Sequence, residues 1–263
     1  MKHWLSILML VVVILAVGQA SAQELTEEEQ QKMLAAANNP LANMTAFNIQ
    51  NYYYADLYGT DDSSNTAWLR FVKPVGKWLF RASLPIPTVP TPRTADPVSG
   101  LGDLNMFAAY LLSDPSAPAQ FGVGPLVAAP TATNDALGVD AWQAGAAAVY
   151  FNAESPQVQW GGLLTWQTSV SGEDDTSVSV LQPFLMLQLG KGTYLRSAPL
   201  WVFDLENDTY NVPLGVGIGK ILKVDRTVFN MFIEPQWTVL HDGVGQPEFT
   251  VFVGLNLQFL PKR

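Results

Sequence analysis

Apolar and polar residues alternate along most of the chain from about residue 47 onward. The clearest run is FTVFVGLNLQF at 249–259, in which every second residue from Phe249 is apolar and the intervening residues are mostly polar or small. Similar runs cover 229–239, 157–166 and 210–219. A period of two places successive side chains on opposite faces of a β-strand. Each run therefore predicts a strand with one apolar face.

Weaker runs of the same kind fill the rest of the chain and bring the expected total to about twelve strands. An even number of strands returns the chain to the side where it started, as in single-chain bacterial barrels. The weaker runs cover residues 45–56, 65–72, 77–86, 103–112, 119–128, 141–151, 178–189 and 193–203.

The length of the runs favours a membrane barrel over a soluble β-sandwich, which also alternates. The four clearest runs are about ten to eleven residues long, close to the roughly 9–11 residues that a tilted strand needs to cross lipid. Strands of globular proteins average about 5–6 residues. The second face carries glycine, glutamine and asparagine, which suits a polar lumen. We therefore predict an all-β fold, an antiparallel transmembrane β-barrel over residues 45–263.

The first 22 residues are typical of a signal peptide. The basic start MKH is followed by an almost wholly apolar stretch at 5–17 and by small residues at 20–22, so cleavage is expected before Gln23. A membrane anchor is the alternative, but the stretch is short for the about 20 residues that a spanning helix needs. Residues 23–44 are expected to form a periplasmic N-terminal segment with a short surface helix at 24–37, whose acidic start suits the helix dipole.

Composition narrows the class of protein further. Charged residues make up only 14% of the 263 residues, against roughly 25% in soluble domains. The net charge of -9 argues against a nucleic-acid partner, because a phosphate backbone needs a basic face. The chain has no cysteine, and after the signal peptide it has one histidine, His241, so a metal site built on several histidines or thiolates is excluded. We expect no catalytic residue, no metal and no cofactor.

The connections between the expected strands sort by charge. Acidic residues gather in every second connection, for example 169–177 and 204–208, whereas the intervening turns carry basic residues such as Lys191 and Arg226. The exceptions are Asp114, Glu154 and Asp225 in the basic set and Arg93 in the acidic set. If the N-terminus is periplasmic, the acidic connections lie outside the cell, where barrel loops are longer. The two acidic clusters could bind a divalent cation or meet the cations that bridge lipopolysaccharide, although a solvated loop is the simpler explanation.

Five residues on the polar faces of the runs are candidates to face the lumen. A charge inside a barrel is satisfied by water or by a partner across the lumen. Arg70 and Arg81 lie on neighbouring expected strands, so they could form a basic patch that lines a pore. They could equally pair with acidic residues and help to plug the lumen. The candidates are Arg70, Arg81, Asp103, Glu234 and Gln236.

Several segments together resemble one family of bacterial outer-membrane proteins. The family is usually labelled "neuromedin U" or "transporter" and is similar to the phenol meta-pathway outer-membrane proteins. The resemblance covers about residues 40 to 263 and implies an outer-membrane barrel involved in transport, with no settled substrate and no catalytic residues to carry over. The segments that carry it are NPLA at 39–42, GLGD at 100–103, FGVGP at 121–125, PTATNDALG at 130–138, LQPF at 181–184 and VPLGVG at 212–217.

We therefore expect a non-enzymatic transporter or channel for small molecules, hydrophobic ones included, in the cell outer membrane. The alternative is a non-conducting structural or adhesive barrel whose lumen is filled by its own side chains. A third class, an outer-membrane lipid-modifying enzyme, is disfavoured by the scarcity of histidine. The expected partners are outer-membrane lipid, lipopolysaccharide, the barrel assembly machinery and a small solute of unknown identity.

Overall fold

The computed structural model describes residues 37–91, 96–114, 117–155 and 157–260. The expected signal peptide at 1–22 lies outside the described residues, as does all but the last residue of the expected helix at 24–37. In the described part of the chain, no helix is long and apolar enough to cross a membrane.

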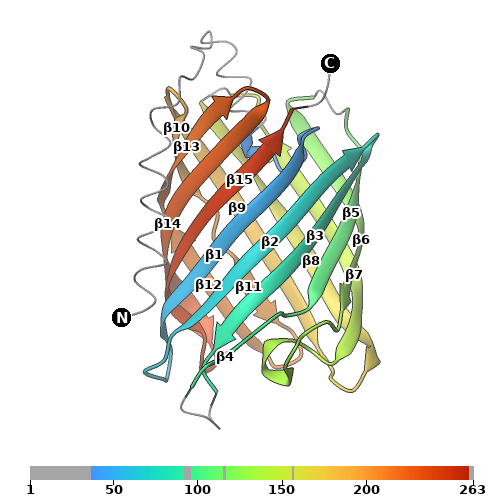
Figure 1. Cartoon of the computed structure of the whole chain (residues 1–263), viewed down its shortest axis with the longest axis vertical. Helices are drawn as coiled ribbons and strands as arrows, with labels where there is room; N and C mark the ends of the chain where they lie inside the picture. The colour runs from blue at the N-terminus through green and yellow to red at the C-terminus, as the bar shows by residue number, and fades with distance from the viewer. Residues whose placement is uncertain (1–36, 92–95, 115–116, 156, 261–263) are drawn as a thin grey trace.

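The described residues form one closed antiparallel barrel of twelve strands (Figure 1), which confirms the predicted fold class. The barrel closes where β1 pairs with β15, with Thr45 opposite Phe259. The strands are β1 (Thr45–Leu57), β2 (Ser64–Val75), β3 (Trp78–Val89), β5 (Leu104–Leu111), β6 (Ala119–Ala129), β7 (Ala141–Asn152), β8 (Val158–Gly172), β9 (Ser177–Gly190), β10 (Thr193–Ser197) with β11 (Trp201–Asp204), β12 (Thr209–Gly215) with β13 (Gly217–Val224), β14 (Thr227–Asp242) and β15 (Pro247–Phe259).

Two neighbouring barrel strands are each interrupted. β10 and β11 both pair with β9 and together make one strand across the wall, and β12 and β13 do the same along β14. The first interruption includes Pro199, which has no N–H to donate to a ladder. The second lies at Val216, a few residues after a register shift at Pro213. The wall is therefore irregular at one place, where the two interruptions are adjacent.

The outer face of the barrel is apolar. Large side chains such as Leu164 and Leu185 are exposed there, at 45% and 51%. Aromatic pairs lie toward both ends of the strands. Trp78 and Tyr110 have ring centroids 5.1 Å apart near one end, and Trp237 and Phe249 are also 5.1 Å apart toward the other. An apolar band between two aromatic girdles is the surface that a membrane barrel presents to lipid.

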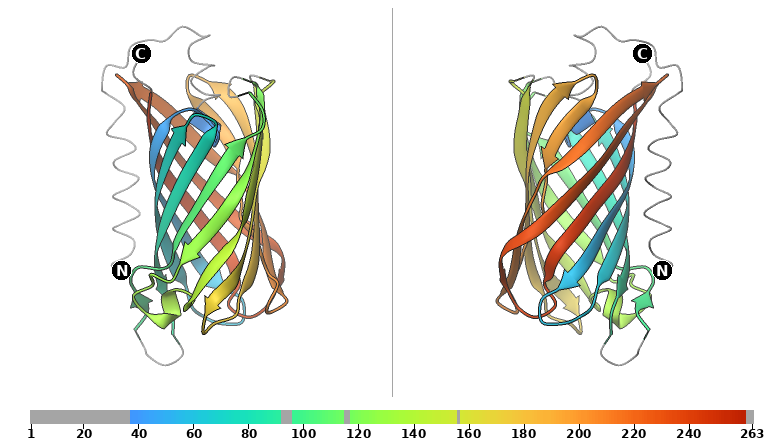
Figure 2. Two further views of the ribbon diagram at one scale, coloured as in Figure 1. Left: turned by 90° about the vertical axis from the view of Figure 1, so that its right-hand side faces the viewer. Right: turned by 90° about the vertical axis from the view of Figure 1, so that its left-hand side faces the viewer.

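The two ends of the barrel differ in the length and charge of their connections. We call one end the turn end: it has the tight turns at 76–77, 191–192 and 225–226, and the described chain begins and ends there (Figures 1 and 2). The opposite loop end carries the longer connections, among them 130–140 with the short 3-10 helix η2 (Asp135–Leu137), and the small strand β4 (Val98–Ser99) that pairs with β3. The acidic connections of the sequence gather at the loop end.

Candidate functional site: the lumen of the barrel

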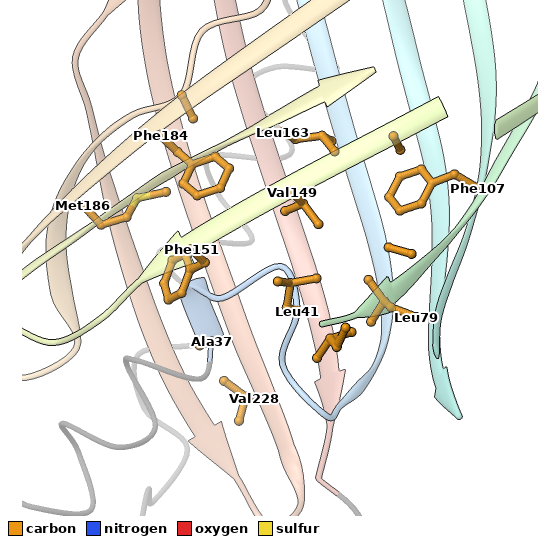
Figure 3. Close-up of a cluster of buried hydrophobic side chains, with 14 of the residues drawn as sticks. Ala37, Leu41, Leu79, Phe107, Val149, Phe151, Leu163, Phe184, Met186 and Val228 are labelled. Atoms are coloured by element: carbon orange, nitrogen blue, oxygen red, sulfur yellow. The ribbon is translucent and has the colours of Figure 1, made fainter. Parts of the chain in front are cut away.

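Residues 37–44 fill the lumen at the turn end, and we call them the plug segment. Ala37, Leu41 and Met44 are buried, although they precede the first barrel strand. Figure 3 shows Leu41 inside the barrel, surrounded by side chains that point inward from several strands. Leu41 packs in one cluster with Leu79 and Phe151, which come from β3 and β7. The plug segment was expected to precede the barrel, and the structure places it inside the lumen.

Polar contacts tie the plug segment to widely separated strands. The Asn39 amide donates to Gln120 Oε1 of β6 at 2.7 Å. The Asn38 amide donates to Gln159 Oε1 of β8 at 3.3 Å. From β14, the Asn230 amide donates to the carbonyl oxygen of Ala37 at 3.1 Å. Amide side chains thus hold the segment from three directions.

A buried ion pair between β10 and β14 lies further along the barrel, on the loop-end side of the plug segment. Glu234 of β14 is fully buried, at 0%, and its Oε2 accepts from Arg196 Nε of β10 at 2.7 Å. Its Oε1 accepts from the backbone N–H of Ala198 and from the Gln236 amide, each at 2.9 Å. The Ala198 N–H lies at the interruption between β10 and β11, so the carboxylate replaces the ladder partner missing there. A buried charge needs such a set of partners.

Aromatic rings continue this layer toward β1. The Arg196 guanidinium carbon lies 3.5 Å from the Phe232 ring centroid. Phe232 meets Phe252 edge-on at 4.8 Å, and Phe252 stacks on Tyr52 at 4.0 Å. Offset and edge-to-face contacts are the arrangements that aromatic pairs prefer. The layer narrows the lumen from the side of β14, β15 and β1.

Arg70 and Arg81 face this layer from the neighbouring strands β2 and β3. Arg70 is opposite Ser83 in the ladder, and Arg81 is opposite Val72, so the two arginines are diagonal neighbours on the inner face. Each guanidinium lies over an aromatic ring: Arg70 is 4.6 Å from the Trp68 centroid and Arg81 is 4.4 Å from that of Phe107. Arg70 Nη1 also donates to Gln50 Oε1.

Two cavities remain inside the barrel, one on each side of this narrowing. The plug-side cavity has a volume of about 170 Å³ and the loop-side cavity about 350 Å³. Both are lined by Arg70 and Arg81, together with Leu163 and Gln182. The two arginines therefore belong to the wall that the two cavities share.

The connection 130–140 borders the loop-side cavity, and Asp103 fixes its shape. The Asp103 carboxylate accepts backbone N–H groups of Thr131 at 3.0 Å, Ala132 at 3.1 Å and Val139 at 2.6 Å. Gly138 lies against this carboxylate, and a Cβ there would lie 2.6 Å from Asp103 Oδ1. Three N–H donors satisfy a carboxylate well. The Asp103 carboxylate thus fixes the 130–140 connection at the loop end of the barrel.

The five sequence candidates take three different places. Arg70 and Arg81 line both cavities, Asp103 holds the 130–140 connection, and Glu234 with Gln236 belongs to the buried layer. Within the described residues, neither arginine forms an ion pair with Asp103 or Glu234; the partner of Glu234 is Arg196. Arg70 and Arg81 instead lie near each other as lining residues of both cavities.

Sequence reasoning missed Arg196 and the plug segment. Arg196 stands two residues from Tyr194 in a predicted strand, so alternation alone could have placed it on the inner face. The plug segment gave a weaker signal. Its motif NPLA was noted as part of a family resemblance, but nothing in a local pattern shows that a segment folds back into a lumen.

The described part of the lumen presents polar and aromatic groups rather than a cluster of metal ligands. Among the described residues, no three histidine, aspartate or glutamate side chains gather closely enough to hold a metal ion. His241 lies at the loop end and stacks on Tyr58, with ring centroids 3.5 Å apart. The two cavities of the lumen are lined by guanidinium, amide and aromatic groups.

Comparison with known proteins places this barrel beside outer-membrane channels. No protein-family model matches the sequence, and no curated protein matches it. An outer-membrane channel from Pseudomonas putida F1 is similar in structure, with a TM-score of 0.63 and 14% identity over 82% of this chain and 96% of that one. The NanC porin has a TM-score of 0.55 and 8% identity over 82% of this chain and 100% of that one. The chain has the fold of outer-membrane channels and porins.

Proposed function

We propose that this protein is an outer-membrane channel for small molecules. The observation that carries the proposal is the pair of cavities, about 170 and 350 Å³, that share Arg70 and Arg81 in their walls inside a closed barrel. A barrel whose only task is structural needs no internal space with polar groups along it. The shared fold with solved outer-membrane channels supports the same proposal.

The alternative is a non-conducting structural barrel, and the plug segment favours it. Leu41 is buried in an apolar cluster, and amide hydrogen bonds hold the segment to β6, β8 and β14. A channel with this plug must either conduct around it or displace it. Conduction therefore has to be measured with the plug in place and with the plug weakened.

The test is single-channel conductance of the purified, folded full chain in planar lipid bilayers. The wild type should give discrete conductance steps, and Leu41→Asp should give larger ones, because a carboxylate cannot stay unpaired in the apolar cluster. Leu205→Asp is the matched control, since Leu205 is exposed in the loop between β11 and β12. It should conduct like the wild type.

The possible outcomes separate the two functions. A wild type that stays closed while Leu41→Asp conducts would favour the structural barrel sealed by its plug. If neither the folded wild type nor the folded Leu41→Asp variant conducts, the channel function is rejected. Folding is checked by the different electrophoretic mobility of heated and unheated barrel.

Four finer statements belong to the same proposal. The chain is exported by a signal peptide cleaved before Gln23, and the barrel assembly machinery inserts it into the outer membrane, in contact with lipid and lipopolysaccharide. It has no enzymatic activity. The family with the label "neuromedin U" is its proposed family, supported by the motifs at 100–103 and 130–138, which the structure brings together around Asp103. Mass analysis of the mature N-terminus tests the cleavage.

A further inference from the structure

We propose that the lumen holds a binding site for a small organic carboxylate with an apolar body, formed by Arg70, Arg81 and Ser83. This inference rests on the proposed channel function for its biological meaning and names the class of solute. The site lies on the inner face of β2 and β3, at the border of the loop-side cavity.

Three buried hydrogen-bond donors of neighbouring strands have no acceptor among the described residues. Arg70 Nε, Arg81 Nε and the Ser83 hydroxyl are buried and have no hydrogen-bond partner in the described part of the chain. Ser83 is opposite Arg70 in the ladder, and Arg81 is the diagonal neighbour. Buried polar groups without partners are rare, and each one left unsatisfied is costly. A carboxylate is an acceptor with two oxygens and satisfies such a set of donors.

The charge balance of the lumen points to an anion. The charged side chains that line the two cavities are Arg70, Arg81, Arg196 and Asp103. Arg196 is neutralised by Glu234, and Asp103 is occupied by backbone N–H groups. Two adjacent like charges on one face of a sheet are unfavourable. Among the residues that the structure describes, the two remaining arginines therefore have no counter-ion, which a bound anion supplies.

Aromatic rings orient the two guanidinium groups toward the cavity. Trp68 and Phe107 each cover one face of an arginine at less than 5 Å, as given above. Arg70 Nη1 donates to Gln50 Oε1, so the remaining guanidinium N–H groups of the two arginines are the donors that a carboxylate can use. This pre-organisation reduces the entropy that ligand binding would otherwise cost.

The opposite walls of the loop-side cavity decide what kind of anion fits. They carry Leu137, Leu163, Val180 and Leu200 besides amide and hydroxyl groups. A volume of about 350 Å³ lies at the small end of the roughly 300–1,000 Å³ of ligand pockets. Such a wall binds an apolar body, which inorganic phosphate and sulfate lack.

The acidic loop end does not prevent an anion from reaching the site. Its carboxylates are exposed to solvent, where their field is screened over about 8 to 10 Å at physiological ionic strength. Buried charges such as those at the site are screened much less. The loops therefore slow the approach of an anion more than they weaken its binding.

The first measurement is calorimetric binding of benzoate to the purified full chain in detergent. Benzamide, which has nearly the same shape and no charge, should bind at least about tenfold more weakly, the factor for losing a charge-assisted hydrogen bond. Sulfate tests the role of the apolar walls and should also bind more weakly. Equal binding of benzamide, or tighter binding of sulfate, would overturn the proposed ligand class.

Variants assign the binding to the site. Arg81→Gln and Arg70→Gln should each weaken benzoate binding by about tenfold or more, and Arg81→Lys should restore part of it, because the charge returns without the fork. Lys73→Gln is the matched control: it removes the same charge from the same strand as Arg70, but Lys73 contacts Thr45 and is exposed. Loss of binding in the Lys73 variant alone, or in none of the variants, would contradict the site.

A second measurement keeps this inference separate from the channel function. The reversal potential in a potassium chloride gradient should show anion preference in the wild type and lose it in Arg81→Gln. A barrel that conducts without anion preference and does not bind benzoate keeps its channel function and loses this site. A barrel that binds benzoate through Arg81 but never conducts keeps the site and loses the channel.

Discussion

At the scale of single residues, the parity of a strand predicts which face a side chain takes but not its partner. Arg70 and Arg81 line the two cavities, and Glu234 is buried. The pairing of Glu234 with Arg196 could not be predicted, because β13 lies between β10 and β14 in the sheet and the two side chains reach each other across it. Partners across a lumen depend on the register of every strand between them.

The buried pair gives a prediction for stability. Glu234→Gln leaves the Arg196 guanidinium, which is itself buried, without a counter-charge, and breaking a buried pair in this way costs about 3–5 kcal/mol. The measurement is urea unfolding of the barrel in lipid vesicles. Asp242→Asn removes an exposed acid at the end of the same strand and should change the unfolding free energy by less than about 0.5 kcal/mol. Similar losses in the two variants would contradict the role given to the pair.

At the scale of elements, the run lengths were a good guide and the interruptions were not. All expected strands exist, and the runs at 193–203 and 210–219 each correspond to one strand across the wall. Each is split because regular strand pairing is broken at 198–200 and at Val216, although the Val216 N–H still donates to the Pro235 carbonyl oxygen at 3.3 Å. Pro199 in the sequence could have indicated the first interruption, because proline has no backbone N–H to donate to a neighbouring strand. Whether that breaks the strand depends on which strand lies beside it, and the sequence does not show this. At the first interruption the Glu234 carboxylate, which is 36 residues away in sequence, accepts the backbone N–H of Ala198.

Because side chains of β8 alternate between the outer face and the lumen, adjacent positions should differ in how well they tolerate an arginine. Leu164 is on the outer face near the middle of the strand, and Thr165 lines the loop-side cavity. Leu164→Arg should cost about 2–4 kcal/mol, the penalty for arginine facing lipid at the midplane. Thr165→Arg should fold with a smaller loss, because its charge lies in a polar lumen. Unfolding free energies in vesicles decide this, and a costlier Thr165 variant would reverse the assigned faces.

At the scale of the whole molecule, the even strand count places both ends of the barrel chain at the same end of the barrel. The two-residue turns lie at that end and most acidic residues of the connections lie at the other, although Asp114, Glu154 and Asp225 belong to the turn end. Most of this sorting could be predicted from the sequence, since length and charge mostly differ between alternate connections. The plug did not follow, because a segment inside a lumen needs contacts from many strands at once, such as Gln120 and Asn230 with their amides.

The sidedness can be tested by labelling, because the chain has no cysteine of its own. Glu206→Cys lies at the loop end and should react with a membrane-impermeant maleimide on intact cells. Lys77→Cys lies at the turn end and should react only after the outer membrane is permeabilised. Labelling of the Lys77 variant alone on intact cells would show the opposite orientation. Both positions are exposed, so access rather than burial decides the result.

The pairing of β1 with β15 has a consequence for how the protein is made. The first strand of the barrel cannot find its second neighbour until the last strand has left the ribosome, so closure waits for complete synthesis. Joining residues so far apart in sequence carries a large entropic cost, and non-local strand pairing is slow. Until then β1 and β14 are open edges that can pair with any other chain. The nascent polypeptide must therefore be kept unaggregated by something outside itself, and a chain shortened before Pro247 would never lose that dependence.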